Sequence, residues 1–254
     1  MLREMLIRFR DGEITLEEAM KEIEGLRIET IGEIARIDLG RMMRCGMPEV
    51  VLAEGKEPGH LRQIVEGIVA AKGTGIVSRL TPPGAVDLKI FAEEQGYQVR
   101  YNERARMMVI STVAQPPPSG GVVAVITAGT SDISVAEEAR VIAEEMGCRV
   151  CTAYDVGAAG IHRLFPALRD CLDAHAFVVA AGREGTLPAV VAGLVDRPVI
   201  GVPVSSGYGY MGKGHAALAS MLQSCSVLTV VNIDAGFTAG ASAALIANMV
   251  VDSR

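Results

Sequence analysis

The segment GVVAVITAGTSD, residues 121–132, constrains the fold of this chain more than any other. It begins with a run of branched apolar residues and alanine, which is typical of a strand buried on both faces of a sheet. A turn of small residues follows, and Ser134 with Glu137 has the spacing of a capping box that begins a helix. Helix N-termini present free backbone N–H groups that favour phosphate. The segment therefore predicts either a capped turn without a ligand or a ligand site at three polar residues, Thr130, Ser131 and Asp132.

The same pattern of strand, short turn and helix repeats five times up to the C-terminus. Strands are predicted at 122–128, 149–153, 176–180, 199–202 and 229–232. Helices are predicted at 134–146, 159–171, 187–194, 214–224 and 239–250. Such repeats with short connections predict a parallel sheet with right-handed crossovers, covered by helices on both faces. The expected fold class is α/β, with three layers.

Residues 1–114 have a different character, with more charge and shorter elements. A capping box in TLEE predicts a helix from Thr15 to Gly25. Further strands are expected at 49–53 and 75–79, helices at 60–72 and 87–95, and a strand region at 97–110. A stretch rich in proline and glycine, 115–121, marks a boundary. We therefore expect a small α/β domain over 1–114 and a second domain over 120–254.

Composition excludes several classes of function. Half of the residues are hydrophobic, 4% are aromatic and tryptophan is absent, which suits a sheet packed with small aliphatic side chains. The formal net charge of −6 without a basic run argues against nucleic acid as a partner. No apolar segment is long enough to span a membrane, and the first residues lack the pattern of a signal peptide. The expected location is the cytoplasm.

The five cysteines argue against a disulfide framework, because their number is odd. Cys148 and Cys151 have CxxC spacing, but they lie in a predicted strand, whereas redox CxxC motifs begin a helix. We interpret both as structural cysteines and Cys171 as a core residue. By spacing alone Cys225, at the end of a predicted helix, is more typical of a buried small residue than of a reactive thiol.

Polar or titratable residues follow every predicted strand, at the edge where open α/β sheets bind ligands. Together with the first three, the candidates are Asp155, His162, Arg163, Gly182, Glu184, Ser205, Ser206, Gly207 and Tyr208. Arg163 could pair with a phosphate or carboxylate, and His162 could transfer protons or be an ordinary surface residue. Glu184 could act as a base or form a salt bridge. The loop 203–212 could cradle a phosphate or be a flexible surface loop.

Several long segments resemble a known family. AGTSDISVAEEA, DVGAAGIHRL, AAGREGTLPAVVAGLVDRPVIGVP, SSGYGYMGKGHAALASMLQSC and VVNIDAGF are similar to the PurE class of aminoimidazole ribonucleotide (AIR) carboxylases and mutases, and more closely to the LarB family of nickel-pincer nucleotide cofactor biosynthesis proteins. IARIDLGRMMRCGMPEVVLAEGK, residues 34–56, resembles LarB proteins and has no PurE counterpart. The resemblance implies a PurE-like, flavodoxin-like second domain.

The resemblance also implies an activity. LarB-like proteins carboxylate the pyridinium ring of nicotinic acid adenine dinucleotide at C5 and hydrolyse its phosphoanhydride, giving pyridinium-3,5-biscarboxylic acid mononucleotide and AMP. The implied co-substrate is CO2 or bicarbonate, and the implied assembly is a homo-octamer with sites shared between subunits. The metal requirement stays open; Mg²⁺ on the pyrophosphate would assist hydrolysis by neutralising charge.

The resemblance assigns roles to individual residues. Cys225 would be the nucleophile of a covalent adduct, Glu184 would take the C5 proton, and His162 would line the nucleotide or CO2 region. Ser131 and Asp132 would hold ribose or phosphate. A group from the N-terminal motif would close over the dinucleotide: Asp38, Arg41, Arg44 and Glu49.

The chain departs from the family pattern at several positions. Arg183 replaces a usual methionine, Val204 a threonine, Ser206 a valine and Ala235 an asparagine, and the usual ProGly is missing after Cys225. Two other functions stay open: a PurE-type mutase, which needs no cysteine, and a nucleotide-binding module without catalysis. A dehydrogenase is disfavoured because no GxGxxG follows the first strand of the repeats.

Overall fold

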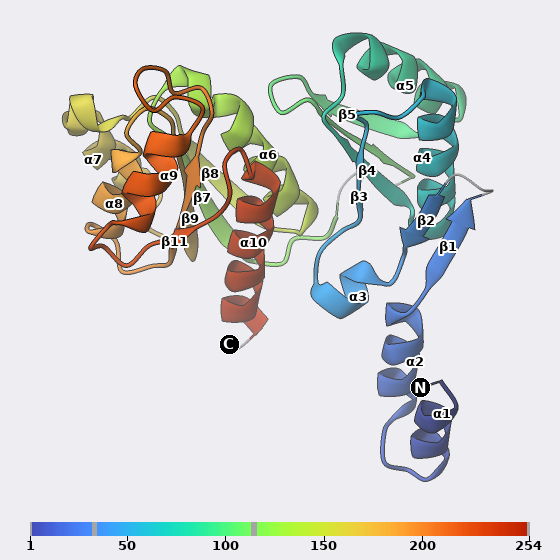
Figure 1. The fold of residues 1–254 in the computed structure, drawn as a ribbon. Coiled ribbons are helices and arrows are strands. Elements are labelled where there is room, and N and C mark those ends of the chain that lie inside the picture. The colour runs from blue at the N-terminus through green and yellow to red at the C-terminus, as the bar shows by residue number, and fades with distance from the viewer. Residues whose placement is uncertain (1, 32–34, 113–115, 253–254) are drawn as a thin grey trace. The chain divides into compact units, whose positions relative to one another are not determined.

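The computed structural model describes residues 2–31, 35–112 and 116–252, and these form two compact units (Figure 1). The first unit comprises 1–101 with 108–114, and the second comprises 102–107 with 115–254. Gln115, the first residue of the predicted boundary stretch, and Ile34, the first residue of the LarB-like motif, lie outside the described residues.

The first unit is a small α/β structure. Its elements are α1 (Leu2–Arg10), α2 (Leu16–Gly25), β1 (Ile28–Ile31), β2 (Ala35–Asp38), α3 (Arg41–Cys45), β3 (Val50–Leu52), α4 (Pro58–Lys72), β4 (Thr74–Ser78), α5 (Pro82–Glu94), β5 (Gln98–Asn102) and β6 (Met107–Ser111). The sheet order is β3-β4-β6-β5, and β1 pairs with β2 separately. The predicted capping box of α2 is confirmed: Thr15 Oγ1 accepts from the Glu18 N–H at 3.2 Å, and the Glu18 carboxylate accepts from the Thr15 N–H at 2.7 Å.

The strand region predicted at 97–110 is two strands, β5 and β6, joined by a tight turn. Asn102 Oδ1 accepts from the Ala105 N–H at 3.0 Å, and Arg106 adopts a left-handed φ of 53°. An asparagine side chain that bonds its own turn in this way interrupts a strand. Hydrophobic periodicity alone did not predict this turn, because strand-forming residues stand on both sides of it.

The second unit contains the predicted five-stranded parallel sheet. Its strands are β7 (Val122–Thr127), β8 (Arg149–Ala153), β9 (Ala176–Ala181), β10 (Val199–Pro203) and β11 (Thr229–Val230). They lie in the order β11-β10-β9-β7-β8, all parallel. The chain thus passes from β7 to one side, then crosses to β9 on the other side, which is the flavodoxin-like order. The predicted fold class is confirmed.

Helices cover both faces of this sheet (Figure 1). On one face lie α6 (Ile133–Glu145) and α10 (Gly236–Asp252), and on the other lie α7 (Leu164–Asp170), α8 (Thr186–Ala192) and α9 (His215–Leu222). A 3₁₀ segment, η2 (Ala158–Arg163), precedes α7. Phe177, Val179 and Ile126 of the strands are almost fully buried against α7, α8 and α9. Central strands covered on both faces explain the unbroken apolar runs in the sequence.

The predicted capping box of Ser134 and Glu137 is wrong. A 3₁₀ turn, η1 (Thr130–Asp132), begins the helical segment earlier, and the Gly129 N–H donates to Asp132 Oδ2 at 2.9 Å. Glu137 instead lies buried and accepts hydrogen bonds from Arg140 at 2.7 Å and from the Tyr154 hydroxyl. Glu137 therefore links α6 to Tyr154, in the segment after β8, and does not cap the helix.

Glu137 makes the stability of the second unit dependent on pH. Burial would raise the pKa of this carboxyl, but the hydrogen bonds from Arg140, Tyr154 and Asn102 outweigh it, and the pKa lies below the usual value of a glutamate. Because the folded pKa is depressed, the ionised group stabilises the fold at pH values above the unfolded pKa. This contribution is lost as the pH falls through the lowered folded pKa.

We expect Glu137→Gln to lower the free energy of unfolding by about 2–4 kcal/mol at pH 7. The difference from wild type in urea titrations should shrink below about pH 4; a difference constant with pH would contradict this role.

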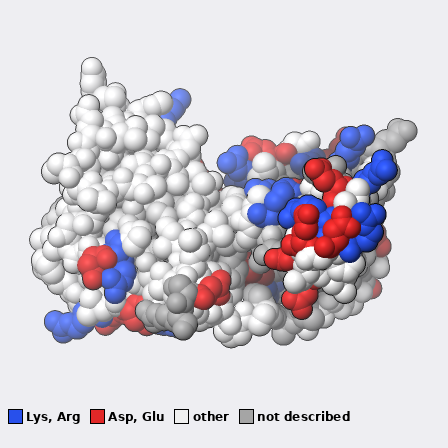
Figure 2. Space-filling model, turned by 90° about the horizontal axis from the view of Figure 1, so that it is seen from below, with Lys and Arg blue, Asp and Glu red and all other residues white. Residues whose placement is uncertain are grey.

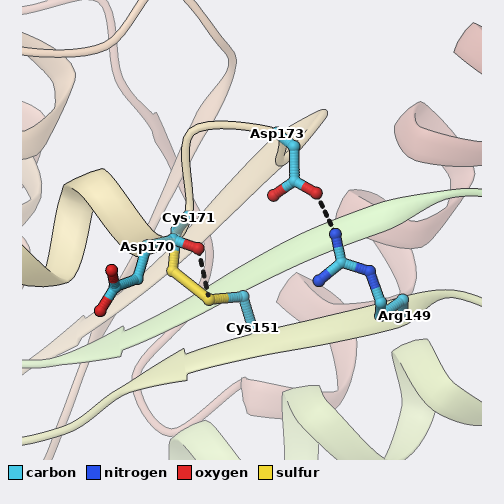
Figure 3. The surroundings of a disulfide bond; sticks show 5 residues. All are labelled: Arg149, Cys151, Asp170, Cys171 and Asp173. Carbon is cyan, nitrogen blue, oxygen red and sulfur yellow. Dashed lines mark hydrogen bonds and ion pairs between the residues drawn. A yellow bond between two sulfur atoms is a disulfide. The ribbon is translucent and has the colours of Figure 1, made fainter.

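A disulfide joins Cys151 of β8 to Cys171, just after α7, with Cα atoms 6.0 Å apart (Figure 3). Arg149 of the same strand pairs with Asp173 beyond this bond (Figure 3). The expectation from the odd cysteine count, that the chain has no disulfide framework, is wrong for this pair. Cys171 is indeed fully buried. The bond arises because α7 ends beside β8, at the edge of the sheet, and sequence spacing does not reveal that proximity.

Reduction of this disulfide is expected to destabilise the second unit. The bond closes a loop with a sequence separation of 20, so the unfolded chain should gain entropy worth about 3 kcal/mol when it opens. Urea unfolding with and without a phosphine reductant measures the difference, and a Cys151→Ala, Cys171→Ala variant should be insensitive to the reductant. In denaturant, Cys45, Cys148 and Cys225 should react with a thiol reagent before reduction, and all five cysteines after it. Five reactive thiols before reduction would show that the bond is absent.

The surface of the second unit carries few charges on the face that Figure 2 shows. This agrees with the sequence, in which residues 198–251 contain only Lys213 and Asp234 as charged side chains. Within the described residues, no helix has the length and apolar character needed to cross a membrane.

Candidate functional site

A pocket of about 430 Å³ opens at the carboxyl ends of the parallel strands in the second unit. Its walls come from the segments that follow β7, β8, β9 and β10. The pocket therefore lies between β7 and β9, two neighbouring strands in the sheet. From β7 the chain goes on to β8 on one side, and from β9 it goes on to β10 on the other. This is the topological switch point at which open α/β sheets bind ligands.

Asp132 is the buried polar centre of this pocket, with a residue exposure of 3%. Its Oδ2 accepts from the Gly129 N–H at 2.9 Å, and its Oδ1 accepts from the Ser206 hydroxyl at 2.9 Å. A buried carboxylate needs such donors, because an unpaired charge away from water is costly. The bond from Ser206 ties the loop after β10 to the loop after β7, and the bond from Gly129 lies within the loop after β7. The hydroxyl of Ser206 makes this bond possible, because an apolar side chain at this position would have no donor.

Backbone contact between two loops requires glycine at two positions. A Cβ at Gly182 would lie 2.8 Å from Ser206 Oγ, and one at Gly207 would lie 2.7 Å from the Arg183 nitrogen. Both distances are shorter than a Cβ tolerates. The loop after β10 therefore packs against the loop after β9 through the Ser206 hydroxyl at Gly182 and through backbone contact at Gly207.

Six of the predicted site residues line this pocket together: Ser131, Asp132, Gly182, Glu184, Ser206 and Tyr208. Ser131 and Glu184 are exposed to the cavity and the solvent, so both can reach a bound molecule. The Arg183 guanidinium lies over the Tyr208 ring, 4.2 Å from its centroid. Polar residues of the first, third and fourth loops thus lie together at one pocket.

The other predicted residues of the second unit do not line the pocket: Thr130, Asp155, His162, Arg163, Ser205, Gly207 and Cys225. Arg163 pairs with Asp155 at 2.9 Å, so the cation expected to bind a substrate anion is held by a carboxylate from the same loop. The Ser205 N–H donates to Asp234 Oδ1 at 2.8 Å. His162 is exposed in η2.

Cys225 is exposed, and the expectation of a buried small residue from spacing alone is wrong. It follows α9 and precedes β11, whereas the pocket is built from segments that follow strands. The thiol is thus accessible, but it lies outside the pocket of its own chain.

The polar residues of the N-terminal motif form ion pairs within the first unit. Arg44 donates to Asp38 at 3.2 Å and Arg41 donates to Glu49 at 3.2 Å. The hydrogen bonds from Arg44 lower the pKa of the Asp38 carboxyl. These residues are paired with one another in α3 and its flanking strands, and none lines the pocket.

Sequence reasoning missed part of the pocket wall. Gly157, Ala158 and Ala159, after β8, line it, while the titratable residues of the same loop do not. Their signal was the run of small residues itself, which lets a ligand approach the backbone. Among the described residues, no group of three or more His, Cys, Asp or Glu side chains is arranged to hold a metal ion.

Comparisons with known proteins agree over both units. Residues 122–253 match the AIR carboxylase family, and residues 28–112 match the LarB/PurE-like N-terminal domain. The chain is 40% identical to an uncharacterized protein of Methanocaldococcus jannaschii over 257 residues, covering 98% of this chain and 97% of that protein. It is 31% identical over 128 residues to an N5-carboxyaminoimidazole ribonucleotide mutase of the same organism, covering 49% of this chain and 75% of the mutase.

The two domain matches stand in the order that the sequence motifs predicted, and they span the small N-terminal unit and the parallel sheet that holds the pocket. The chain therefore belongs to the LarB family, in which a LarB/PurE-like N-terminal domain precedes an AIR carboxylase domain, and it is a carboxylase of the PurE/LarB type.

Proposed function

We propose that this protein carboxylates the pyridinium ring of nicotinic acid adenine dinucleotide at C5 and hydrolyses its phosphoanhydride. The products are pyridinium-3,5-biscarboxylic acid mononucleotide and AMP. The observation that carries the proposal is the convergence of Ser131, Asp132 and Glu184 on one pocket at the switch point of the sheet. This pocket offers carboxylates beside the positively charged ring and hydroxyl groups beside the ribose.

The chemistry requires a nucleophile because a pyridinium ring is electron-poor and does not attack CO2. Addition of a thiolate to the ring gives a neutral dihydropyridine whose C5 is enamine-like. C5 then forms a bond to the carbon of CO2, loss of the C5 proton regenerates the dihydropyridine, and expulsion of the thiolate restores the pyridinium. Such covalent catalysis replaces one prohibitive step with several easier ones.

Glu184 is the residue that we assign to the C5 proton. It lines the pocket and is exposed, so its carboxylate can reach a bound ring. Asp132 is held by two donors, and this fixes its position as a contact for ribose hydroxyls. Ser131 is the neighbouring hydroxyl on the same wall. His162 and Arg163, outside the pocket, would act at its rim.

Cys225 is the proposed nucleophile, and it would have to come from another copy of the chain. The thiol is exposed but lies outside the pocket of its own chain. Residues near it, such as Leu222 and Val227, are exposed and apolar, and residues 198–251 contain only two charged side chains. An apolar surface of this kind favours contact between copies. We propose a homo-octamer in which subunits share the sites.

In hydrolysis of the anhydride, water attacks one phosphorus atom and the P–O bond to the bridging oxygen breaks, which leaves one phosphate on each product. The described residues form no dedicated cation site, so we assign no step to a protein-held metal. Mg²⁺, as a proposal, would arrive on the pyrophosphate oxygens of the substrate.

A second function is favoured by one observation, the 31% identity with an N5-carboxyaminoimidazole ribonucleotide mutase over the AIR carboxylase domain. A mutase of that type would move a carboxylate on an aminoimidazole ribonucleotide and would not need Cys225. The N-terminal unit and the exposed thiol favour the dinucleotide reaction.

The test incubates the full chain with nicotinic acid adenine dinucleotide, ¹³C-bicarbonate and Mg²⁺, followed by mass spectrometry. We expect AMP together with a mononucleotide that carries one labelled carboxylate. Glu184→Gln should slow the incorporation of label. Unchanged dinucleotide alongside conversion of an aminoimidazole ribonucleotide would establish the mutase, and binding of the dinucleotide without any turnover would indicate a module without catalysis.

A further inference from the structure

Arg183 stands on the pocket wall in an unusual backbone conformation. It follows Gly182 at the end of β9, and its φ of 37° lies in the left-handed region that favours glycine. Non-glycine residues adopt this region where the surrounding structure holds them there, often at ligand sites. Here Gly207 packs directly against the Arg183 backbone. The loop after β10 therefore keeps the arginine at the rim of the cavity.

The arginine side chain is oriented by an aromatic ring. Its guanidinium carbon lies 4.2 Å from the centroid of Tyr208, which also lines the pocket. A guanidinium stacked on a ring keeps its N–H groups in its own plane, where they can donate two parallel hydrogen bonds to a carboxylate or phosphate. Stacking thus prepares Arg183 to bind a planar anion.

The charges of the pocket leave Arg183 available for such an anion. Of the side chains that line the cavity, Arg183 is the one that is positively charged, and Asp132 and Glu184 are negative. Asp132 already accepts from Gly129 and Ser206. No ion pair joins Arg183 to either carboxylate in the part of the chain that the structure describes. The pocket therefore presents both signs of charge to a bound molecule.

A nicotinate ring in a nucleotide also has both signs, a positive ring nitrogen and a negative carboxylate at C3. From this match we infer that Arg183 binds the C3 carboxylate and makes the protein prefer a nicotinate ring over a nicotinamide ring. This inference rests on the proposed function and deepens it. Glu184, the next residue, is the group assigned to C5 of the same ring. Arg183 is therefore closer to a substituent on that ring than to a phosphate at the far end of the nucleotide.

Binding measurements on two mononucleotides that differ only in this substituent test the inference. Calorimetric titration compares nicotinic acid mononucleotide with nicotinamide mononucleotide on the full chain. We expect the wild type to bind the acid about 10- to 100-fold more tightly, the scale of a charge-assisted hydrogen-bonded pair. Arg183→Met should bring the ratio close to one, and Arg183→Lys should retain part of it because a lysine keeps the charge but not the paired donors.

Controls separate this role from a structural one. Arg197→Met removes an exposed arginine outside the pocket and should leave the acid-to-amide ratio unchanged. A collapsed loop would weaken both ligands equally and leave the ratio intact. Titration with nicotinic acid riboside gives a second ratio, that of the nucleotide to the nucleoside. If Arg183→Met reduces this second ratio and not the first, the arginine binds phosphate and the inference is wrong.

The outcome is independent of turnover. A ratio that depends on Arg183 in a protein that fails to carboxylate the dinucleotide would support the inference and refute the proposed function. If the wild type carboxylates the dinucleotide but Arg183→Met leaves the acid-to-amide ratio unchanged, the function is supported and the inference is refuted. A wild type without preference for the acid, or without binding of either mononucleotide, would also overturn it.

Discussion

Replacing Cys225 with serine is expected to lower the rate of carboxylation by about 10³-fold or more, the scale on which enzymes respond to loss of a covalent nucleophile. A serine hydroxyl is not ionised at neutral pH, whereas a thiol supplies the thiolate that adds to the ring. Because the side chain is exposed, the substitution should leave the free energy of unfolding within about 0.5 kcal/mol of wild type. Incorporation of ¹³C-bicarbonate measures the rate, and urea unfolding measures the stability.

The matched control is Cys45→Ser, which changes the other exposed free cysteine of the described chain and should retain full activity. A mixing experiment then tests whether sites are shared. Cys225→Ser and Glu184→Gln are each expected to be impaired, and mixing them through mild dissociation and reassembly should recover part of the activity. Absence of recovery would place both residues in one chain's site, and full activity of Cys225→Ser would remove the thiol from the mechanism.

Replacing Gly240 with alanine is expected to lower the free energy of unfolding by about 2–3 kcal/mol. Gly240 lies in α10, where a Cβ would approach the Ala139 carbonyl oxygen of α6 to 2.4 Å. The contacted atoms belong to a helix backbone, so they cannot move aside as a flexible side chain would. The two helices must separate, and the layer that covers one face of the sheet loosens. Urea unfolding of the full chain, followed by circular dichroism, measures the loss.

Gly59 provides the control for this substitution. It also lies in a helix, α4, but a Cβ there would meet nothing within 4 Å. Gly59→Ala should therefore leave stability unchanged or raise it by up to about 1 kcal/mol, because alanine restricts the unfolded chain more than glycine does. Equal effects of the two substitutions would show that the close contact of α6 and α10 does not limit stability.

Much of the second unit could be predicted because its signals are local. The strand at 122–127 lies within a continuous apolar run, and each repeat begins and ends at small residues near the predicted positions. Local signals failed where a side chain bonds to a partner from another element. Glu137 has the spacing of a capping residue, but it is buried and accepts hydrogen bonds from Arg140 and from Tyr154, which follows β8. Cys151 and Cys171 lie in separate elements, and only the fold brings them together.

The candidate site divides in the same way. The sequence located the edge of the sheet, because ligand sites in open parallel sheets follow the carboxyl ends of strands. It did not reveal which charged group faces the cavity. Arg163 and Arg183 both follow strands, yet Asp155 holds the first outside the pocket, while the second lies against Tyr208 on the wall. Charge pairing depends on distances between loops, which a linear pattern does not contain.

The sequence by itself determined the fold class, the order of the two parts and the family, since these depend on local periodicity, turn residues and long matching segments. The tertiary structure alone decided that the Asp132 carboxylate is buried between two loops, that Arg183 is the cation of the pocket and that Cys225 lies outside the pocket of its own chain. The physical reason is that burial and hydrogen bonding arise between segments far apart in the chain, and these contacts set what each polar side chain can bind.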